Sequence, residues 1–162
     1  MGDCYTVVKI RQSTRILKLK LIVQTSTYNN QVQKWIQGAN RSEIMINTDR
    51  PFSTAIDNEE SIYISFISSS KLKKYRKRVT NGRVFLSGEV VPFPLTVDRH
   101  RSIYMVDRYH DRVFQIDEGR TNISIVIGGS EHIGTHQLSK PHSVAVDRGP
   151  GPHSDQLHGP TD

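Results

Sequence analysis

The sequence has few of the residues that build covalent or metal-linked sites. Its 162 residues include one cysteine, Cys4, which excludes an intrachain disulfide and a zinc site of the ribbon or RING type. No window approaches the roughly 20 apolar residues that a membrane-spanning helix needs. A glycine-rich phosphate loop, a nucleophile elbow and a carboxylate pair are also missing from the sequence. We therefore expect no catalytic residues, no metal, no cofactor and no membrane contact.

The composition is that of a polar, basic domain. The chain has 22 lysines and arginines against 16 aspartates and glutamates, a formal net charge of +6. Such a balance favours anionic partners. Hydrophobic residues make up 35% of the chain, which is low for a globular protein but above the level of a disordered one. The length is sufficient for one domain with a core.

Three segments share one pattern, a proline followed six residues later by an aspartate. The segments are 51–57, 92–98 and 141–147, and their prolines are 41 and 49 residues apart. Larger and smaller side chains alternate between proline and aspartate, which predicts a strand packed on both faces. The proline begins the strand, where a missing N–H costs least, and the aspartate carboxylate can bond the following turn. The structural positions are Pro51, Asp57, Pro92, Asp98, Pro141 and Asp147.

A second motif keeps nearly the same period. It covers residues 28–35, 68–75 and 109–116, with apolar residues at its fifth and eighth positions, and its copies are 40 and 41 residues apart. Residues 62–64 and 103–106 add one more apolar strand to two of the repeats. Several short strands in about 40 residues indicate one blade of a β-propeller. Asp107 and Arg112 are expected to tie a hairpin through an ion pair or hydrogen bond.

These motifs closely resemble the NHL repeat, best in residues 97–116, and the resemblance covers about residues 22–147. It implies an all-β fold, an incomplete β-propeller of NHL-type four-stranded blades. About three blades are expected, the first and the last incomplete. Residues 125–129 fit the connecting loop of the family. Residues 1–21 are left unassigned, and residues 148–162, rich in glycine and proline, are predicted to form a disordered tail.

A propeller presents loops on a flat face and needs no chemistry to bind. The first functional prediction is therefore a non-catalytic protein-binding or scaffold module. An unclosed ring exposes the apolar faces of its end blades, so we expect self-association that closes the ring, or a longer parent protein. The resemblance also implies an alternative, the substrate-recognition part of a tripartite-motif ubiquitin ligase. Without a signal peptide or membrane span, the sequence favours a cytoplasmic location.

A second alternative is RNA binding. Six of the eight residues 71–78 are basic, interleaved with leucine and tyrosine, and some NHL propellers bind RNA through a basic face. The cations would contact phosphates and the tyrosine would stack on a base. A solvated blade edge explains the run more simply, because alternate residues of a strand face opposite sides. The residues concerned are Lys71, Lys73, Lys74, Tyr75, Arg76, Lys77 and Arg78.

An enzyme fragment is the third alternative. Residues 141–143 resemble a blade of the peptide-amidating lyase, in which histidines of several blades hold a metal in the central channel. At the positions that match His142, the other repeats carry Phe52 and Phe93. One histidine cannot hold a catalytic metal, so we expect no such activity.

Overall fold

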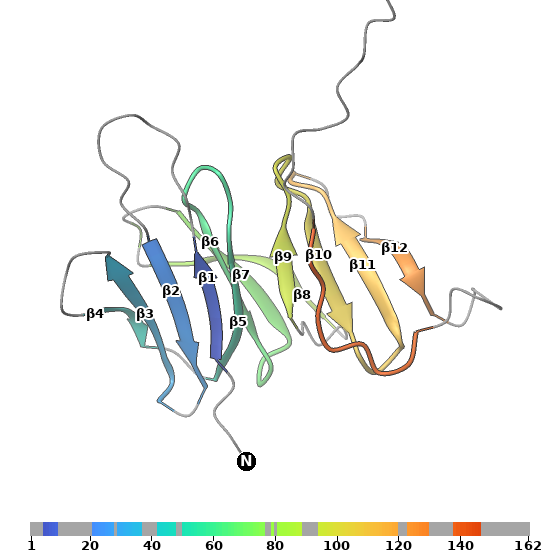
Figure 1. The fold of residues 1–162 in the computed structure, drawn as a ribbon, viewed down its shortest axis with the longest axis horizontal. Coiled ribbons are helices and arrows are strands. Elements are labelled where there is room, and N and C mark those ends of the chain that lie inside the picture. The colour runs from blue at the N-terminus through green and yellow to red at the C-terminus, as the bar shows by residue number, and fades with distance from the viewer. Residues whose placement is uncertain are drawn as a thin grey trace, which may run out of the picture.

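The computed structural model describes residues 5–9, 21–27, 29–36, 42–47, 50–76, 79, 81–88, 94–119, 123–129 and 138–146. Within these ranges the chain is all-β, with twelve strands in three four-stranded antiparallel sheets. The sheets follow one another along the chain as the blades of a partial propeller (Figure 1). The predicted fold class is confirmed. A search of the described residues for a helix that could span a bilayer finds none.

We name the three sheets blades 1, 2 and 3. Blade 1 contains β1 (Tyr5–Lys9), β2 (Leu21–Ser26), β3 (Gln31–Ile36) and β4 (Ser42–Asn47). Blade 2 contains β5 (Pro51–Ile56), β6 (Ile62–Phe66), β7 (Lys71–Tyr75) and β8 (Arg83–Ser87). Blade 3 contains β9 (Leu95–Val97), β10 (Ile103–Asp107), β11 (Arg112–Ile116) and β12 (Ile123–Gly128). In each blade every strand pairs with the next one along the chain.

Blade 1 reaches into the segment that the sequence left unassigned. β1 pairs antiparallel with β2, from Tyr5 opposite Ser26 to Lys9 opposite Ile22. The first blade therefore has four strands, which corrects the expectation that it is incomplete. β1 lacks the proline and the aspartate of the repeat. Its β-branched and aromatic residues still suit a strand once β2 offers a ladder.

The outermost strand of blade 3 corrects a second expectation. The family resemblance places residues 125–129 in a connecting loop, but most of them belong to β12, which pairs with β11. A bulge in that pairing falls at Val126. A bulge interrupts the alternation of side chains, so the period of two is weak in the sequence of this strand.

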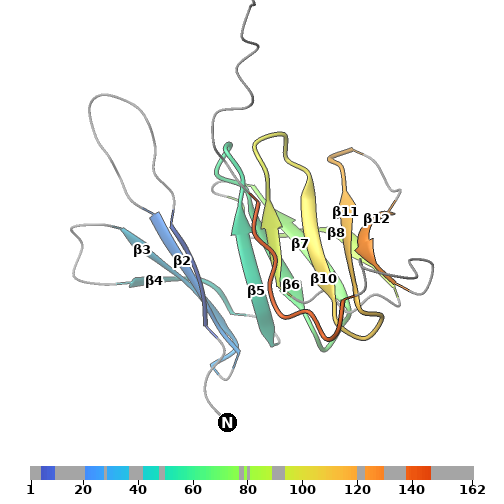
Figure 2. The ribbon, with the colours of Figure 1, turned by 45° about the vertical axis from the view of Figure 1, so that its right-hand side comes forward.

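Blade 2 is packed on both faces, because successive side chains of a strand point to opposite sides. One cluster joins it to blade 1 and consists of Val32, Ile56, Ile62, Ile64, Phe66 and Tyr75, with Met45 and Ile46 against it. The other cluster joins it to blade 3 and consists of Ala55, Tyr63, Leu72, Leu95, Val97, Ile103, Met105, Phe114 and Ile116. Figure 2 shows blade 2 between the other two sheets. The core of the protein is thus a pair of interfaces between blades.

The aspartate that follows the first strand shapes the next turn in the same way in blades 2 and 3. Asp57 Oδ1 accepts hydrogen bonds from the N–H groups two and four residues later, at 2.9 and 2.8 Å. Asp98 Oδ1 accepts the equivalent pair, both at 2.8 Å. The third residue after each aspartate has a positive φ, 62° at Glu60 and 69° at Arg101. The two repeats therefore share a turn as well as a sequence pattern.

The third copy of the proline motif does not form the predicted strand. Residues 141–146 are irregular, and no strand of the described ranges pairs with them. A strand needs a neighbour to satisfy its backbone N–H and C=O groups, and sequence alternation alone does not supply one. Pro92, Asp147 and residues 148–162 lie outside the described residues.

Candidate functional site

The predicted RNA-contacting residues lie mainly on β7, the third strand of blade 2. Leu72 and Tyr75 are 0% and 4% exposed and face opposite interfaces. Burial raises the pKa of Tyr75. The expectation that Tyr75 stacks on a base is wrong, because its ring is packed between blades 1 and 2. Lys73 Nζ lies 5.3 Å from the centroid of the Phe66 ring.

Lys74 points toward blade 3 and is neutralised there. Its Nζ lies 2.6 Å from Glu118 Oε1 and 3.4 Å from Asp57 Oδ2. Burial alone would lower the pKa of Lys74, but its bonds to Glu118 and Tyr63 outweigh that cost and hold the pKa above the ordinary value. Lys74 therefore links two blades, which corrects its assignment to a phosphate-binding patch.

The remaining basic residues do not share one environment. Lys71 and Lys73 are half-buried, and Arg76 is exposed. Lys77 and Arg78 lie outside the described residues. Of the predicted set, Arg76 is the described cation that is most open to solvent.

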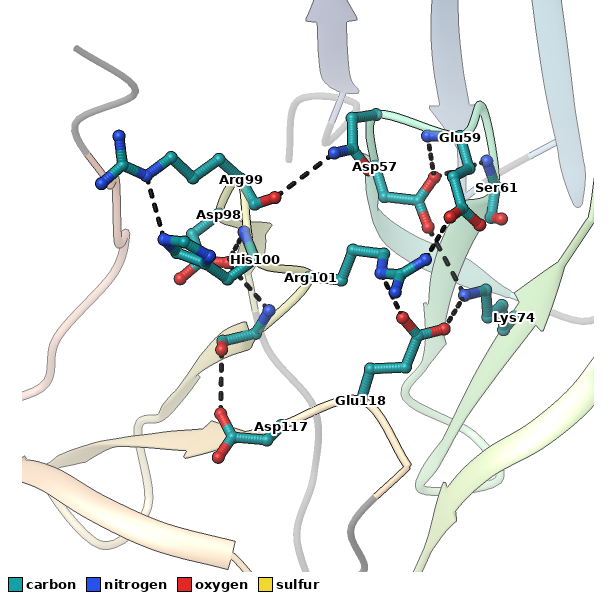
Figure 3. Close-up of polar contacts among 12 residues, drawn as sticks. Asp57, Glu59, Ser61, Lys74, Asp98, Arg99, His100, Arg101, Asp117 and Glu118 are labelled. Carbon is teal, nitrogen blue, oxygen red and sulfur yellow. Dashed lines mark hydrogen bonds and ion pairs between the residues drawn. The ribbon is translucent and has the colours of Figure 1, made fainter. Parts of the chain in front are cut away.

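The turns of blades 2 and 3 meet at the edge that is uppermost in Figure 1, and their charged side chains form one network, shown in Figure 3. Arg101, in the β9–β10 turn, forms ion pairs with Glu59 of the β5–β6 turn and with Glu118 after β11. Asn58 Nδ2 donates to the carbonyl of Arg99 at 3.3 Å. We call this edge of the molecule the upper edge. The ion pairs of Glu118 with Lys74 and Arg101, and of Arg101 with Glu59, join the two blades.

Tyr63 lies directly beneath this network and is completely buried. Its O–H donates to Asp57 Oδ2 at 3.2 Å, and its ring packs nearly perpendicular to that of Phe85, with centroids 5.9 Å apart. Burial raises the pKa of Tyr63 to about 12. Asp57 thus accepts bonds from two N–H groups, a phenol and, at longer range, an ammonium. A carboxylate with both oxygens engaged in this way is structural.

The opposite, lower edge of Figure 1 carries the β10–β11 turn. Arg112 Nε donates to Asp107 Oδ2 at 3.0 Å, across the hairpin as the sequence led us to expect. His110 Nδ1 lies 2.8 Å from the same oxygen, whose carboxylate is buried. The buried carboxylate of Asp107 therefore fixes the turn between these strands by binding two of its side chains.

The geometry offers little for catalysis among the described residues. No group of three or more histidine, cysteine, aspartate or glutamate side chains there is placed to hold a metal ion. His142 is exposed, and Asp57, Asp107 and Glu118 are each paired with a cation. What the arrangement does is fix the blades and their turns relative to one another.

Sequence reasoning missed Glu59, Arg101 and Glu118, which carry the link between blades 2 and 3. A signal for two of them was present. Residues 57–60 read Asp-Asn-Glu-Glu, and the equivalent residues 98–101 read Asp-Arg-His-Arg. Opposite charges at equivalent turns of adjacent repeats predict an ion pair once the blades are known to be neighbours.

Comparisons with known proteins place the fold. No family model matches the sequence, and no curated protein matches it. A chain of the nidogen/laminin complex aligns with a TM-score of 0.62 and 14% identity, over 76% of this chain and 46% of that one. A gluconolactonase from Xanthomonas campestris aligns with a TM-score of 0.57 and 12% identity, over 66% and 43%.

A virginiamycin B lyase from Staphylococcus aureus aligns with a TM-score of 0.57 and 8% identity, over 86% of this chain and 49% of the lyase. These neighbours are β-propeller proteins, and the likeness shows that fold for this chain. The aligned part spans less than half the length of each neighbour. Their names include two enzymes and a protein complex, so the shared fold does not select between catalysis and binding.

Proposed function

We propose that this chain is a non-catalytic propeller unit of the NHL type that binds a protein partner through the lower edge of blade 3. The observation that carries the proposal is the β10–β11 turn. Tyr109 at its tip is 74% exposed, and Arg108 beside it is exposed too. Tyrosine and arginine are the residue types that contribute most binding energy at protein interfaces.

The turn is also rigid enough for recognition. Asp107 is buried and bound to both His110 and Arg112, so the two ends of the turn are fixed to one carboxylate. Gly129 N–H donates to the carbonyl of Asp111 at 3.1 Å, which attaches the turn to the end of β12. A loop ordered in advance loses less conformational entropy on binding.

The non-catalytic part of the proposal is supported by the upper edge. Its carboxylates and cations bind one another across blades 2 and 3, as shown in Figure 3, and so position turns. The NHL assignment is supported by the repeat period and by the shared turn after Asp57 and Asp98. Substrate recognition within a ubiquitin ligase would be one form of the same partner binding.

The test compares Tyr109→Ala with Ser69→Ala, an exposed residue of the matching β6–β7 turn in blade 2. Each immobilised variant is exposed to cell extract, and retained proteins are quantified by mass spectrometry against the unmodified chain. We expect the retained set to persist with Ser69→Ala and to fall at least tenfold with Tyr109→Ala. Equal retention of proteins by both variants would contradict the assignment of the binding surface to the lower edge of blade 3.

RNA binding is a second candidate, favoured by the net charge of +6 and the exposed Arg76. An RNA-binding surface would not include Tyr75 or Lys74, because both side chains lie in the interfaces between blades. If phosphate contacts carry it, affinity for single-stranded RNA falls steeply with salt, and Arg76→Ser reduces the salt dependence. Arg99→Ser, an exposed arginine on a turn of blade 3, is the matched control.

A further inference from the structure

The innermost strand of blade 1 and the third copy of the proline motif depart from the repeat in opposite ways. β1 occupies an innermost position but lacks the proline and aspartate that begin and end such strands elsewhere. Residues 141–147 carry that motif in full, yet the described part of the segment belongs to no sheet. One position in the fold has a strand without the motif, and one segment has the motif without a sheet.

A repeated hydrogen bond places the start of this segment. Lys140, with φ of 46°, donates its N–H to Asp111 Oδ1 at 2.6 Å. Arg50, with φ of 44°, donates its N–H to Asn30 Oδ1 at 3.0 Å. Each donor immediately precedes the proline of the motif, and each acceptor lies in the turn between the second and third strands of a blade. In blade 2, β5 begins at Pro51, the residue that follows this bond.

The same bond therefore directs residues 141–146 along the path of an innermost strand that follows blade 3. Both ribbon views show the segment alongside β9 and β10 (Figures 1 and 2). Val106 and Val113, which alternate with the residues that face blade 2, are nevertheless buried. The inner part of this outward face is thus already covered.

The outer parts of the two end faces remain uncovered. Trp35 is 37% exposed, whereas Tyr75 and Ile116, at the same position of the motif, are 4% and 2% exposed against the preceding blade. At the other end, Val126 is the bulge residue of β12 and is 49% exposed. Phe85, the bulge residue of β8, packs against the cluster shared with blade 3. Both end faces carry apolar residues at positions that a neighbouring blade covers elsewhere.

We propose that two copies of this chain close one ring, in which residues 141–146 of each copy form the innermost strand of the other copy's blade 1. The repeat fixes the register. Blade 3 pairs Leu95 with Met105 and Thr96 with Tyr104. The equivalent pairs are Val144 with Gln24 and Ala145 with Val23 of the second copy. β1 holds those same two positions with Val7 and Val8, so it competes with the second copy for one edge of β2.

A second copy fits the two ends better than an unrelated partner does. One end face lies where a preceding blade belongs and the other where a following blade belongs, so a two-fold axis satisfies both with one contact made twice. The aligned part of this chain covers 46%, 43% and 49% of three propeller neighbours. Two such parts amount to nearly one neighbour. The inference is independent of the partner-binding surface at Tyr109.

The register is tested by mixing two single-cysteine chains. In a Cys4→Ser background, one chain carries Ala145→Cys and the other Val23→Cys, so neither forms an intrachain disulfide. Directly opposite residues of paired strands bring their Cα atoms within disulfide range. We expect a reducible species of twice the 18.4 kDa chain mass. Gln24→Cys replaces Val23→Cys in the control and is expected to cross-link at least tenfold less, because a shift of one residue faces the other side of the sheet.

Light scattering of the unmodified chain over a concentration series supplies the second measurement. We expect a dimer whose fraction rises several-fold with Val7→Pro, which weakens β1, and falls several-fold with Val146→Pro, which removes a backbone donor from the exchanged strand. A monomer at every concentration overturns the proposal. A dimer in which the Ala145→Cys and Val23→Cys chains form no disulfide overturns the strand exchange. The strand exchange is also overturned if neither Val7→Pro nor Val146→Pro changes the dimer fraction.

Discussion

Blades 1 and 2 are copies of one repeat that differ in what surrounds them. In blade 2 the residues of β6 are all buried, and β5 is buried at all but one position. In β7 of the same blade Leu72 and Tyr75 are buried, whereas in its counterpart β3 of blade 1 Val32 is buried but Trp35, at the position of Tyr75, is 37% exposed. A repeat of this kind cannot complete a core alone, because each face needs a neighbouring sheet. The difference indicates that stability is concentrated where a blade has neighbours on both sides.

The largest expected effect contrasts Tyr75 with Trp35, which hold the same position in the two blades. Tyr75→Ala should lower the free energy of unfolding by about 3–5 kcal/mol, because it opens a cavity between blades 1 and 2. At protein concentrations where the chain is monomeric, Trp35→Ala should cost about 1 kcal/mol or less, since its ring there is 37% exposed. Urea denaturation of both variants measures the contrast. Equal costs would show that the end face of blade 1 is as well packed as the interior.

Asp57 and Asp98 provide the next contrast, because they shape identical turns in different surroundings. Asp57→Ala leaves two N–H groups and the Tyr63 hydroxyl without their acceptor and removes the longer of the two ion pairs of Lys74, and should cost about 3 kcal/mol. Asp98→Ala affects a half-buried turn and should cost about 1 kcal/mol. Thermal and urea unfolding test the order. The comparison fails if the Asp98 variant is the less stable of the two.

Alkaline pH separates Tyr63 from its counterpart Tyr104. The pKa of Tyr63 is raised to about 12 by burial, from an ordinary value of 10.0. The folded state therefore keeps a proton that the unfolded state releases, so this contribution is complete below pH 10 and is lost as the pH rises toward 12. The pKa of Lys74 is also raised, so its contribution to stability is likewise lost as the pH rises.

Tyr63→Phe should make the alkaline fall of stability shallower, and should cost about 1 kcal/mol at neutral pH through the lost bond to Asp57. Burial raises the pKa of Tyr104 as well, but its ring is only partly buried. Tyr104→Phe should change the alkaline slope less. The measurement is the urea midpoint between pH 8 and pH 11.5, and a larger effect of Tyr104→Phe would contradict the comparison.

The repeat made part of the fold predictable from sequence. The inner strands of blades 2 and 3 were found because proline, aspartate and the apolar positions recur at nearly constant spacing. β1 was not predicted because it carries no motif, and β12 was not predicted because its bulge disrupts the alternation of side chains. Residues 141–146 show the converse, since a motif without a strand to pair with remains irregular.

The site was less predictable than the fold. The role of Asp57 and Asp98 in their turns followed from local chemistry, because an aspartate at a strand end bonds the backbone nearby. The fate of Lys74 and Tyr75 did not, because strand alternation places them on two faces whose neighbours come from other blades. A basic run read along the chain looks like one surface, but blade packing divides it between two interfaces.

Hydrogen exchange, measured residue by residue at the lowest workable protein concentration, tests the concentration of stability in blade 2 most directly. Amides of β5, β6 and β7 should exchange slowest, those of β10 and β11 next, and those of β1 and residues 141–146 fastest. Slowest exchange in the strands of blade 1, or uniform protection of the three blades, would contradict the account.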